Sequence, residues 1–260
     1  MYNRKKKILY TLLFICFFAC AAIVVAKMPI QTAQDQDSDK NSLELHPIVE
    51  KMLSYMEIDN CLISALPQYD NLSIKLFAPT VLPDEVEQYI DNILQDWKQP
   101  YLTDAFVQEA YNVDSISEFK EKIASILTEQ KKIALIANAR SEVVNQLLSH
   151  SKFSINEHSI AKYALQAVEF YETDAYTSNL SFDEYISQKY GDQQTFYESC
   201  YQNACSEIKE YLLIGAIAYK EGLLTDTSWI DSAEEGEVYM MYQDLENTFY
   251  RLFISADENF

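Results

Sequence analysis

Glycine and proline are scarce in this sequence, with 4 and 6 copies among 260 residues. Both residues mark tight turns, so a fold of many short strands joined by β-turns is disfavoured, while long helices are compatible with the composition. Hydrophobic residues make up 48% of the chain, which is sufficient for a well-formed core. We therefore predict a mainly α-helical protein.

The common signatures of catalytic and nucleotide-binding sites are also missing. The sequence contains no G-x-S-x-G, no H-E-x-x-H, no P-loop and no G-x-G-x-x-G. The three histidines, His46, His150 and His158, are too few and too scattered for a His-rich metal site. We expect no enzyme activity, no metal and no cofactor.

Basic residues are outnumbered by acidic ones, with 20 Lys and Arg against 40 Asp and Glu and a net charge of −20. Nucleic acid carries a dense negative charge and binds basic surfaces. This composition therefore excludes nucleic acid as a partner.

The number of cysteines outside the apolar N-terminal run, which are the ones available for disulfides, is odd. Of the 5 cysteines, Cys16 and Cys20 lie in an apolar run, which leaves Cys61, Cys200 and Cys205. Cys200 and Cys205 are five positions apart on an expected helix, which separates them by roughly 8 Å or more, too far for a disulfide. Burial as small apolar residues is the favoured interpretation, and a disulfide from Cys61 to Cys200 or Cys205 stays open.

The N-terminus carries the longest uncharged segment. Residues 4–7 are basic, and residues 8–26 form a 19-residue run without charge. A spanning helix needs roughly 20 apolar residues and a signal-peptide core about 7–15. We predict an anchor or signal segment over 1–27, with a cytoplasmic N-terminus and the rest of the chain exported across the cell membrane. The alternative is secretion after cleavage near Ala26.

The remaining chain divides into a linker and a helical domain. Residues 28–43 are polar and aperiodic, so we expect a flexible linker. Residues 44–260 are expected to form one multi-helix domain with one small extended segment at residues 72–78. That segment is expected to lie on the helices or to pair with residues 61–66.

Apolar periodicity and capping residues locate the helices. Two S-x-x-E capping boxes begin at Ser115 and Ser181, and the first opens a helix of about 35 residues. Asn156 and Asp192 are expected N-caps, and Gly191 and Gly222 expected helix ends. The expected helices cover residues 47–56, 83–97, 115–151, 156–179, 181–191, 192–222 and 237–254.

Five short pieces, in order, resemble the C-terminal domain of trigger factor, a bacterial chaperone. Residues 102–107 resemble LTDEFV, residues 113–122 resemble DVDSVEELKEK, and residues 145–148 resemble NQLLD. Residues 153–157 are similar to FEVPE, with Asn156 in place of proline, and residues 220–222 resemble EKEGI. The resemblance covers about half of the chain and implies a helical chaperone arm that binds clients by surface.

The chain departs from this family in two places. No ribosome-docking domain is recognisable, so we expect no ribosome contact. Relatives insert an FKBP-type isomerase domain between helices like those at 83–97 and 102 onward, where only residues 98–101 stand here. Prolyl isomerase activity is therefore not expected to carry over.

The resemblance implies unfolded or nascent exported proteins as partners, and the 19 tyrosines suggest how they bind. Tyrosine offers apolar contact with a polar tip. The expected client-binding residues are Tyr163, Phe170, Tyr171, Tyr197 and Tyr201; packing between helices is the alternative role for each. The favoured function is a membrane-tethered extracytoplasmic holdase. The alternatives are a non-catalytic helical adaptor for one folded envelope partner, and a foldase partner of a separate prolyl isomerase.

Overall fold

The computed structural model describes residues 42–260 and confirms a mainly helical fold. The described chain forms two compact units, each built from two stretches of sequence. Unit 1 contains Ile74–Ser141 and Ile254–Phe260, and unit 2 contains residues 42–73 and Glu142–Phe253. The predicted anchor (1–27) and all but the end of the predicted linker (28–43) lie outside the described residues. From residue 42 onward, every helix is too short or too polar to cross a membrane.

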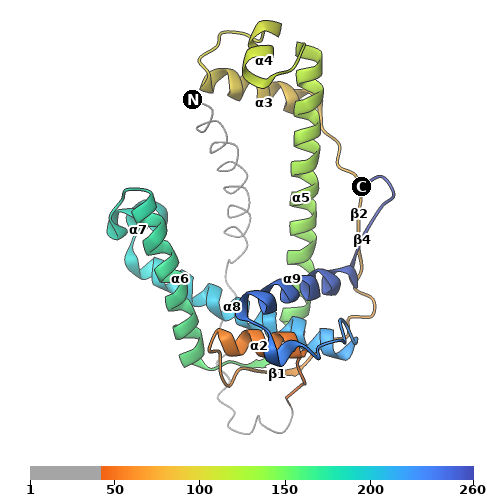
Figure 1. The fold of residues 1–260 in the computed structure, drawn as a ribbon, viewed down its shortest axis with the longest axis vertical. Coiled ribbons are helices and arrows are strands. Elements are labelled where there is room, and N and C mark those ends of the chain that lie inside the picture. The colour runs from red at the N-terminus through yellow and green to blue at the C-terminus, as the bar shows by residue number, and fades with distance from the viewer. Residues whose placement is uncertain (1–41) are drawn as a thin grey trace. The chain divides into compact units, whose positions relative to one another are not determined.

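Unit 1 is built on the long helix α5, Ile116–His150, whose residues up to Ser141 belong to this unit. Helices α3 (Pro83–Asp96) and α4 (Asp104–Tyr111) lie against one end of α5 (Figure 1). The apolar faces of the three helices meet in one core, because each helix repeats its hydrophobic residues at helical spacing. The buried core residues are Val86, Ile90, Val107, Val113, Phe119 and Ile123.

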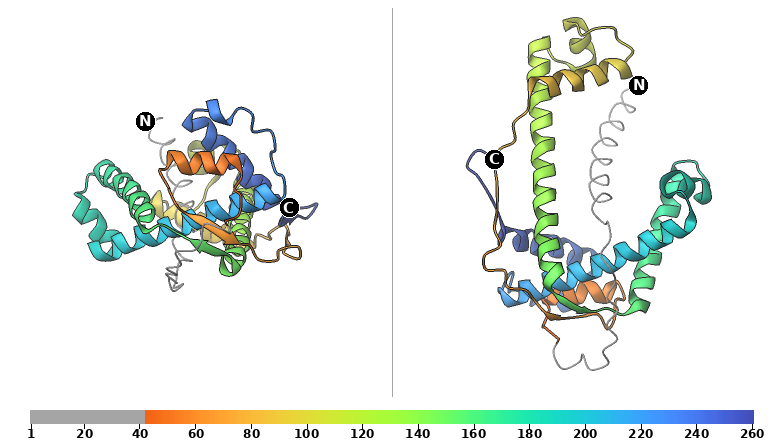
Figure 2. Two further views of the ribbon diagram at one scale, coloured as in Figure 1. Left: turned by 90° about the horizontal axis from the view of Figure 1, so that it is seen from below. Right: turned by 180° about the vertical axis from the view of Figure 1, so that it is seen from behind.

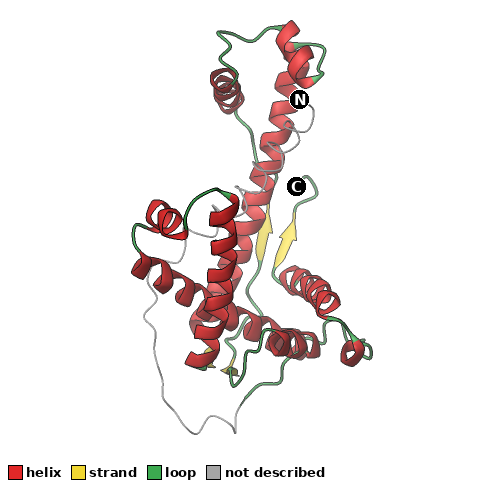
Figure 3. Cartoon of the chain, turned by 60° about the vertical axis from the view of Figure 1, so that its left-hand side comes forward, coloured by secondary structure: helices red, strands yellow, loops and turns green. Residues whose placement is uncertain are grey.

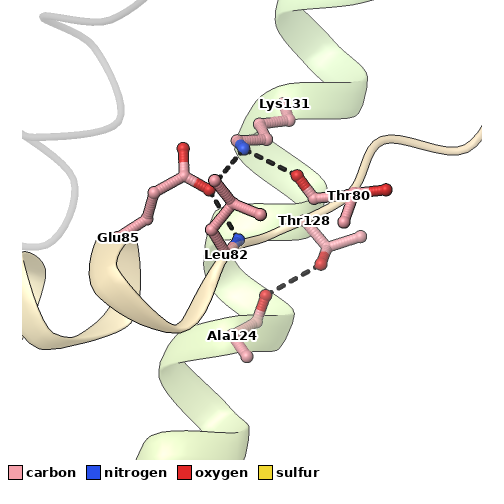
Figure 4. A network of polar contacts seen from close by, with 6 residues as sticks. All are labelled: Thr80, Leu82, Glu85, Ala124, Thr128 and Lys131. Atoms are coloured by element: carbon pink, nitrogen blue, oxygen red, sulfur yellow. Dashed lines mark hydrogen bonds and ion pairs between the residues drawn. The ribbon is translucent and has the colours of Figure 1, made fainter.

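A polar network fixes the start of α3 against α5. Lys131 Nζ lies 2.6 Å from Glu85 Oε2 and donates to the Thr80 carbonyl at 2.8 Å (Figure 4). The same Glu85 oxygen accepts the Leu82 N–H at 2.7 Å, which satisfies one free donor at the helix start. The hydrogen bond from Lys131, followed by that from Leu82, lowers the pKa of Glu85.

Unit 1 also contains a two-stranded parallel sheet. Strand β2 (Ile74–Leu76) pairs with β4 (Ile254–Ala256), and the two strands lie side by side in Figure 3. Lys75 and Asp257 form an ion pair of 3.1 Å next to this sheet. The expected extended segment is thus a strand, but its expected pairing with residues 61–66 is wrong. Sequence pattern marks a strand without identifying its partner, and here the partner is about 180 positions away.

Unit 2 contains the other helices. They are α2 (Pro47–Tyr55), α6 (Glu157–Thr177), α7 (Phe182–Tyr190), α8 (Gln193–Lys220) and α9 (Glu235–Arg251), with a short 3₁₀ turn, η2 (Ile230–Ser232). Strands β1 (Leu62–Ala65) and β3 (Lys152–Ser154) pair antiparallel. In both views of Figure 2, α6 and the first half of α8 extend away from α2 and α9, and α7 joins their far ends. We call α6, α7 and the first half of α8 the α6–α8 arm.

The core of unit 2 surrounds the second half of α8. Every residue from Leu212 to Ala218 is buried there, and α2 and α9 pack against this part of α8. Gly215 is required by close approach, since an added Cβ would lie 3.0 Å from Val49 Cγ1. His46 is buried at the start of α2, where its Nδ1 accepts the Ile48 N–H and its Nε2 lies 2.8 Å from the Leu223 carbonyl.

The capping predictions are confirmed. Asn156, Ser181 and Asp192 are the N-caps of α6, α7 and α8, and each side chain accepts a backbone N–H. Gly191 and Gly222 follow α7 and α8 with φ of 83° and 63°, values that favour glycine. At α5, Ser115 Oγ accepts the Glu118 N–H at 3.2 Å.

The end of the chain differs from the prediction. The last helix ends at Arg251 rather than Ile254, because Ile254 begins strand β4. Leu252, expected on the buried stripe, is 42% exposed. Helix α4, with Thr103 as N-cap, lies in the stretch from residue 102 onward that was expected to be helical, although its bounds were not predicted. Cys61, Cys200 and Cys205 are free thiols and are all buried, in agreement with the favoured interpretation.

Candidate functional site

The α6–α8 arm brings together the five predicted client-binding residues. Tyr163, Phe170 and Tyr171 lie on α6, and Tyr197 and Tyr201 lie on α8. The two helices are packed side by side. The arm keeps its shape because a capping box at Ser181 and the left-handed Gly191 place α7 across its far end.

An aromatic cluster forms the interior of the arm. Phe196 is fully buried, and its ring centroid lies 5.0 Å from that of Tyr190 and 5.4 Å from that of Tyr171, both edge to face. The Tyr171 ring also contacts Tyr185 at 6.4 Å. Such pairs stabilise by about 0.5–1.5 kcal/mol beyond their burial. Tyr171 therefore holds α6, α7 and α8 together in addition to any contact that it offers a client.

A pocket of about 270 Å³ opens between α6 and α8. The rings of Tyr163 and Tyr171 line it from α6, together with the small side chain of Ala167. Ala204 and Cys200 line it from α8. Three polar side chains, Gln166, Asn203 and Glu207, complete the lining. The lining of the pocket is thus mixed, with polar and apolar groups in similar share.

Glu207 and Tyr163 form the polar side of this pocket. The Tyr163 hydroxyl donates to Glu207 Oε2 at 2.7 Å and lies 3.2 Å from the Tyr211 hydroxyl. Burial, then the neighbouring Tyr211 and the Glu207 carboxylate, raises the pKa of Tyr163. Tyr163 is therefore a neutral hydrogen-bond donor near neutral pH. No ion pair between Glu207 and a Lys or Arg exists within residues 42–260.

The predicted residues differ in their exposure. Phe170 is 57% and Tyr197 is 44% exposed, so both rings are free to contact another chain. Tyr163, Tyr171 and Tyr201 are half-buried. Only Tyr163 and Tyr171 of the five line the pocket. The set is therefore divided into two exposed rings, two residues of the pocket, and Tyr201, which belongs to neither group.

Sequence reasoning missed two exposed residues on the arm. Leu165 is 60% and Tyr176 is 82% exposed. They are three turns of α6 apart, so they lie on one stripe of the helix. This spacing was visible in the sequence, but it could not be separated from a core-facing stripe without knowledge of which side of α6 meets α8.

Exposed apolar side chains also occur in unit 1 and elsewhere in unit 2. In unit 1 they include Phe77 at 62%, Tyr101 at 66% and Ile133 at 48%. In the rest of unit 2 they include Met240 at 64% and Tyr219 at 47%. Within the described part of the chain, no group of three or more His, Cys, Asp or Glu is arranged to hold a metal. The exposed side chains of both units thus offer apolar contacts on several elements.

Comparison with known proteins gives one family. The model of the bacterial trigger factor C-terminus matches residues 115–249, which include all of α5 and all of the α6–α8 arm. The trigger factor of Agathobacter rectalis is 26% identical over 136 residues, which are 52% of this chain and 31% of the relative. That of Geotalea daltonii is 23% identical over 163 residues, 62% of this chain and 36% of the relative.

The matched region is a minor part of each relative. The trigger factor of Halothermothrix orenii is 25% identical over 146 residues, 53% of this chain and 33% of the relative. The chain thus spans about a third of the length of these relatives. No solved structure matches. Because the family model matches more than half of the chain, and its range contains the arm with its pocket and aromatic cluster, the chain belongs to the trigger factor C-terminus family.

Proposed function

We propose that this protein is a holdase chaperone that binds unfolded exported polypeptides through dispersed apolar side chains. Membership of the trigger factor family supports a chaperone role in general. Binding would be the sum of many weak contacts, each buried aromatic side chain contributing about 1–2 kcal/mol. Such a surface needs no reactive group, and we propose that the protein is not an enzyme.

The observation that carries the proposal is the distribution of exposed large apolar residues. They occur on several elements of each unit: on α5 and in the segments around α3 in unit 1, and on α6, α8 and α9 in unit 2. A partner with a fixed folded surface is recognised by one contiguous apolar patch. An unfolded chain offers apolar residues at variable spacing, so scattered binding positions suit it better. This favours the holdase over the adaptor for one folded partner.

The proposed place of action is outside the cytoplasm, with the protein held at the membrane. The support is the sequence of residues 1–27, in which four basic residues precede 19 uncharged ones. Such a charge bias favours a cytoplasmic N-terminus and export of the chain after residue 27. A tethered holdase in this position would meet polypeptides as they leave the membrane.

Suppression of aggregation tests the proposal directly. The full-length chain, reconstituted in lipid nanodiscs, is added to a chemically denatured client that is then diluted, and light scattering is followed. We expect scattering to fall in proportion to the amount of chaperone, while empty nanodiscs leave it unchanged. Unchanged scattering at a several-fold excess of the protein over several unrelated clients would rule the holdase out.

A further inference from the structure

We propose that the pocket between α6 and α8 is a subsite for one arginine side chain of a client, with Glu207 binding the guanidinium group. This inference rests on the proposed function and adds a substrate preference to it. The pocket volume of about 270 Å³ lies just below the range of cavities that hold small molecules, which begins near 300 Å³. When a peptide binds, one of its long side chains has a suitable size to occupy the pocket.

The spacing of the lining residues builds a slot along the two helices. Tyr163, Ala167 and Tyr171 recur every four residues on α6, so they lie along one side of that helix. Cys200 and Ala204 are also four residues apart on α8. Two small residues and a thiol thus provide an apolar floor between two tyrosine rings. The aliphatic stem of a long side chain fits such a floor.

The charge at the polar side of the slot selects a cation. Glu207 carries a carboxylate that accepts the Tyr163 hydroxyl and forms no ion pair with a Lys or Arg of residues 42–260. An acidic client side chain would be repelled there. An apolar one would partly desolvate the carboxylate without bringing a cation to it, which is unfavourable. A basic side chain instead gains a charge-assisted hydrogen bond.

The remaining polar groups favour arginine over lysine. Gln166 and Asn203 line the same pocket, and each has an amide oxygen that can accept a hydrogen bond. A guanidinium group presents five donors in one plane and stacks on aromatic rings, whereas an ammonium group is a compact point charge. Tyr163 and Tyr171 line the same pocket and supply aromatic rings for such a contact. Several acceptors beside two rings therefore match the planar cation best.

The test uses two peptides that differ only in charge at one position. Both are unstructured and of the same length, and one carries arginine where the other carries citrulline, which keeps the shape and loses the charge. Their affinities for the full-length protein in nanodiscs are measured by fluorescence anisotropy. We expect the arginine peptide to bind about three- to tenfold more tightly, given the strength of one partly exposed charge pair and one cation–π contact.

Two variants decide whether Glu207 is responsible. Glu207→Gln keeps an oxygen that can accept the Tyr163 hydroxyl, so the arm should fold as before, which circular dichroism verifies. Glu169→Gln makes the same change of charge at an exposed position of α6 that does not line the pocket. We expect Glu207→Gln to abolish the preference for arginine over citrulline and Glu169→Gln to preserve it.

Each other outcome has a distinct meaning. Equal loss of preference in both variants would assign the effect to the general acidic charge of the surface and overturn the subsite. Equal affinity of the two peptides for the unmodified protein would also overturn it, while leaving the proposed function intact. Binding of neither peptide, together with unchanged aggregation in the assay above, would contradict both proposals.

Discussion

Gly215 on α8 and Val49 on α2 approach so closely that a Cβ added to Gly215 would lie 3.0 Å from Val49 Cγ1. The His46 N–H also donates to the Gly215 carbonyl at 3.0 Å, so the start of α2 is fixed to the same point of α8. The absence of a side chain at Gly215 therefore sets the distance between two buried helices.

Replacing Gly215 by a residue with a larger side chain should destabilise unit 2. We expect Gly215→Val to lower the free energy of unfolding by about 1–3 kcal/mol, because a fully buried contact has no free volume for the three added carbon atoms. Val49→Ala in the same chain should recover part of the loss, since it removes both γ-carbons of Val49, which would lie 3.0 and 3.3 Å from the added Cβ. Urea unfolding of the four members of this double-mutant cycle measures the coupling. Strict additivity of the two changes would contradict the predicted contact.

Glu210 should make stability depend on pH. Burial, opposed by the hydrogen bond from Tyr250 and reinforced by Glu246 and Glu207, raises the pKa of Glu210 to about 7. The folded state therefore binds more protons than the unfolded state between the ordinary pKa of about 4.3 and pH 7. This contribution to stability is fully present below that window and is lost as pH rises through 7.

The variant Glu210→Gln removes this titration. The amide can still accept the Tyr250 hydroxyl, so we expect the variant to be more stable than the unmodified protein at pH 8, by about 1–3 kcal/mol, and to show a flatter dependence between pH 5 and 8. Urea midpoints at pH 5.5, 6.5 and 8 provide the measurement. An unchanged slope between pH 5.5 and 8 would mean that the Glu210 carboxyl is ionised throughout that range.

Replacing the aromatic residues of the arm should have one of two effects, either weaker client binding or lower stability. Replacing Phe170 and Tyr197 by Ser should weaken suppression of aggregation with little change in stability, because both rings are exposed. Replacing Tyr171 by Ser should lower the thermal midpoint, because its ring packs on Phe196 and Tyr185. Circular dichroism melts and light scattering on the same preparations separate the effects. Full activity in the Phe170→Ser and Tyr197→Ser double variant would place client binding elsewhere.

Glu85 should stabilise unit 1 by more than its ion pair with Lys131 contributes. The Glu85–Lys131 pair is partly exposed, and such pairs contribute about 0–1 kcal/mol. Glu85 also accepts the Leu82 N–H at the start of α3. We expect Glu85→Ala to lower the stability of unit 1 more than Lys131→Met does, because only the first change also removes the acceptor of the Leu82 N–H. Hydrogen exchange at the Leu82 amide should rise in the first variant only.

Topology provides a separate test of the proposed location. If residues 8–26 span the membrane with the N-terminus in the cytoplasm, protease added to intact spheroplasts should digest the chain after residue 27. A cytoplasmic protein of the same cells serves as the control for lysis. Protection of the chain until detergent is added would show that the domain is not exported.

Local signals in the sequence located the helices accurately. The caps at Asn156, Ser181 and Asp192 and the glycines at 191 and 222 act within one helical turn, so their effect can be derived from neighbouring residues alone. The long helix α5 followed from the same logic, with 35 residues as expected.

Long-range contacts were not predictable in the same way. The partners of β2 and β1 are strands of three residues, too short to show periodicity. The pocket depends on which sides of α6 and α8 meet, and a shift of one residue would exchange the roles of Phe170 and Tyr171. These adjacent aromatics are indistinguishable by composition, yet one is exposed and the other packs on Phe196. The polar half of the pocket, with Gln166, Asn203 and Glu207, gave no recognisable pattern.

The pairing of β2 with β4 has a consequence for synthesis of the protein. Ile74 pairs with Ile254, so β2 leaves the ribosome about 180 residues before its partner strand. Unit 2 also combines residues 42–73 with a stretch that begins only at Glu142. The β2–β4 sheet of unit 1 and the core of unit 2 therefore cannot form while their first segments alone have emerged, and contacts of such high sequence separation form slowly. During translation, the protein therefore passes through a long interval as an incompletely folded chain.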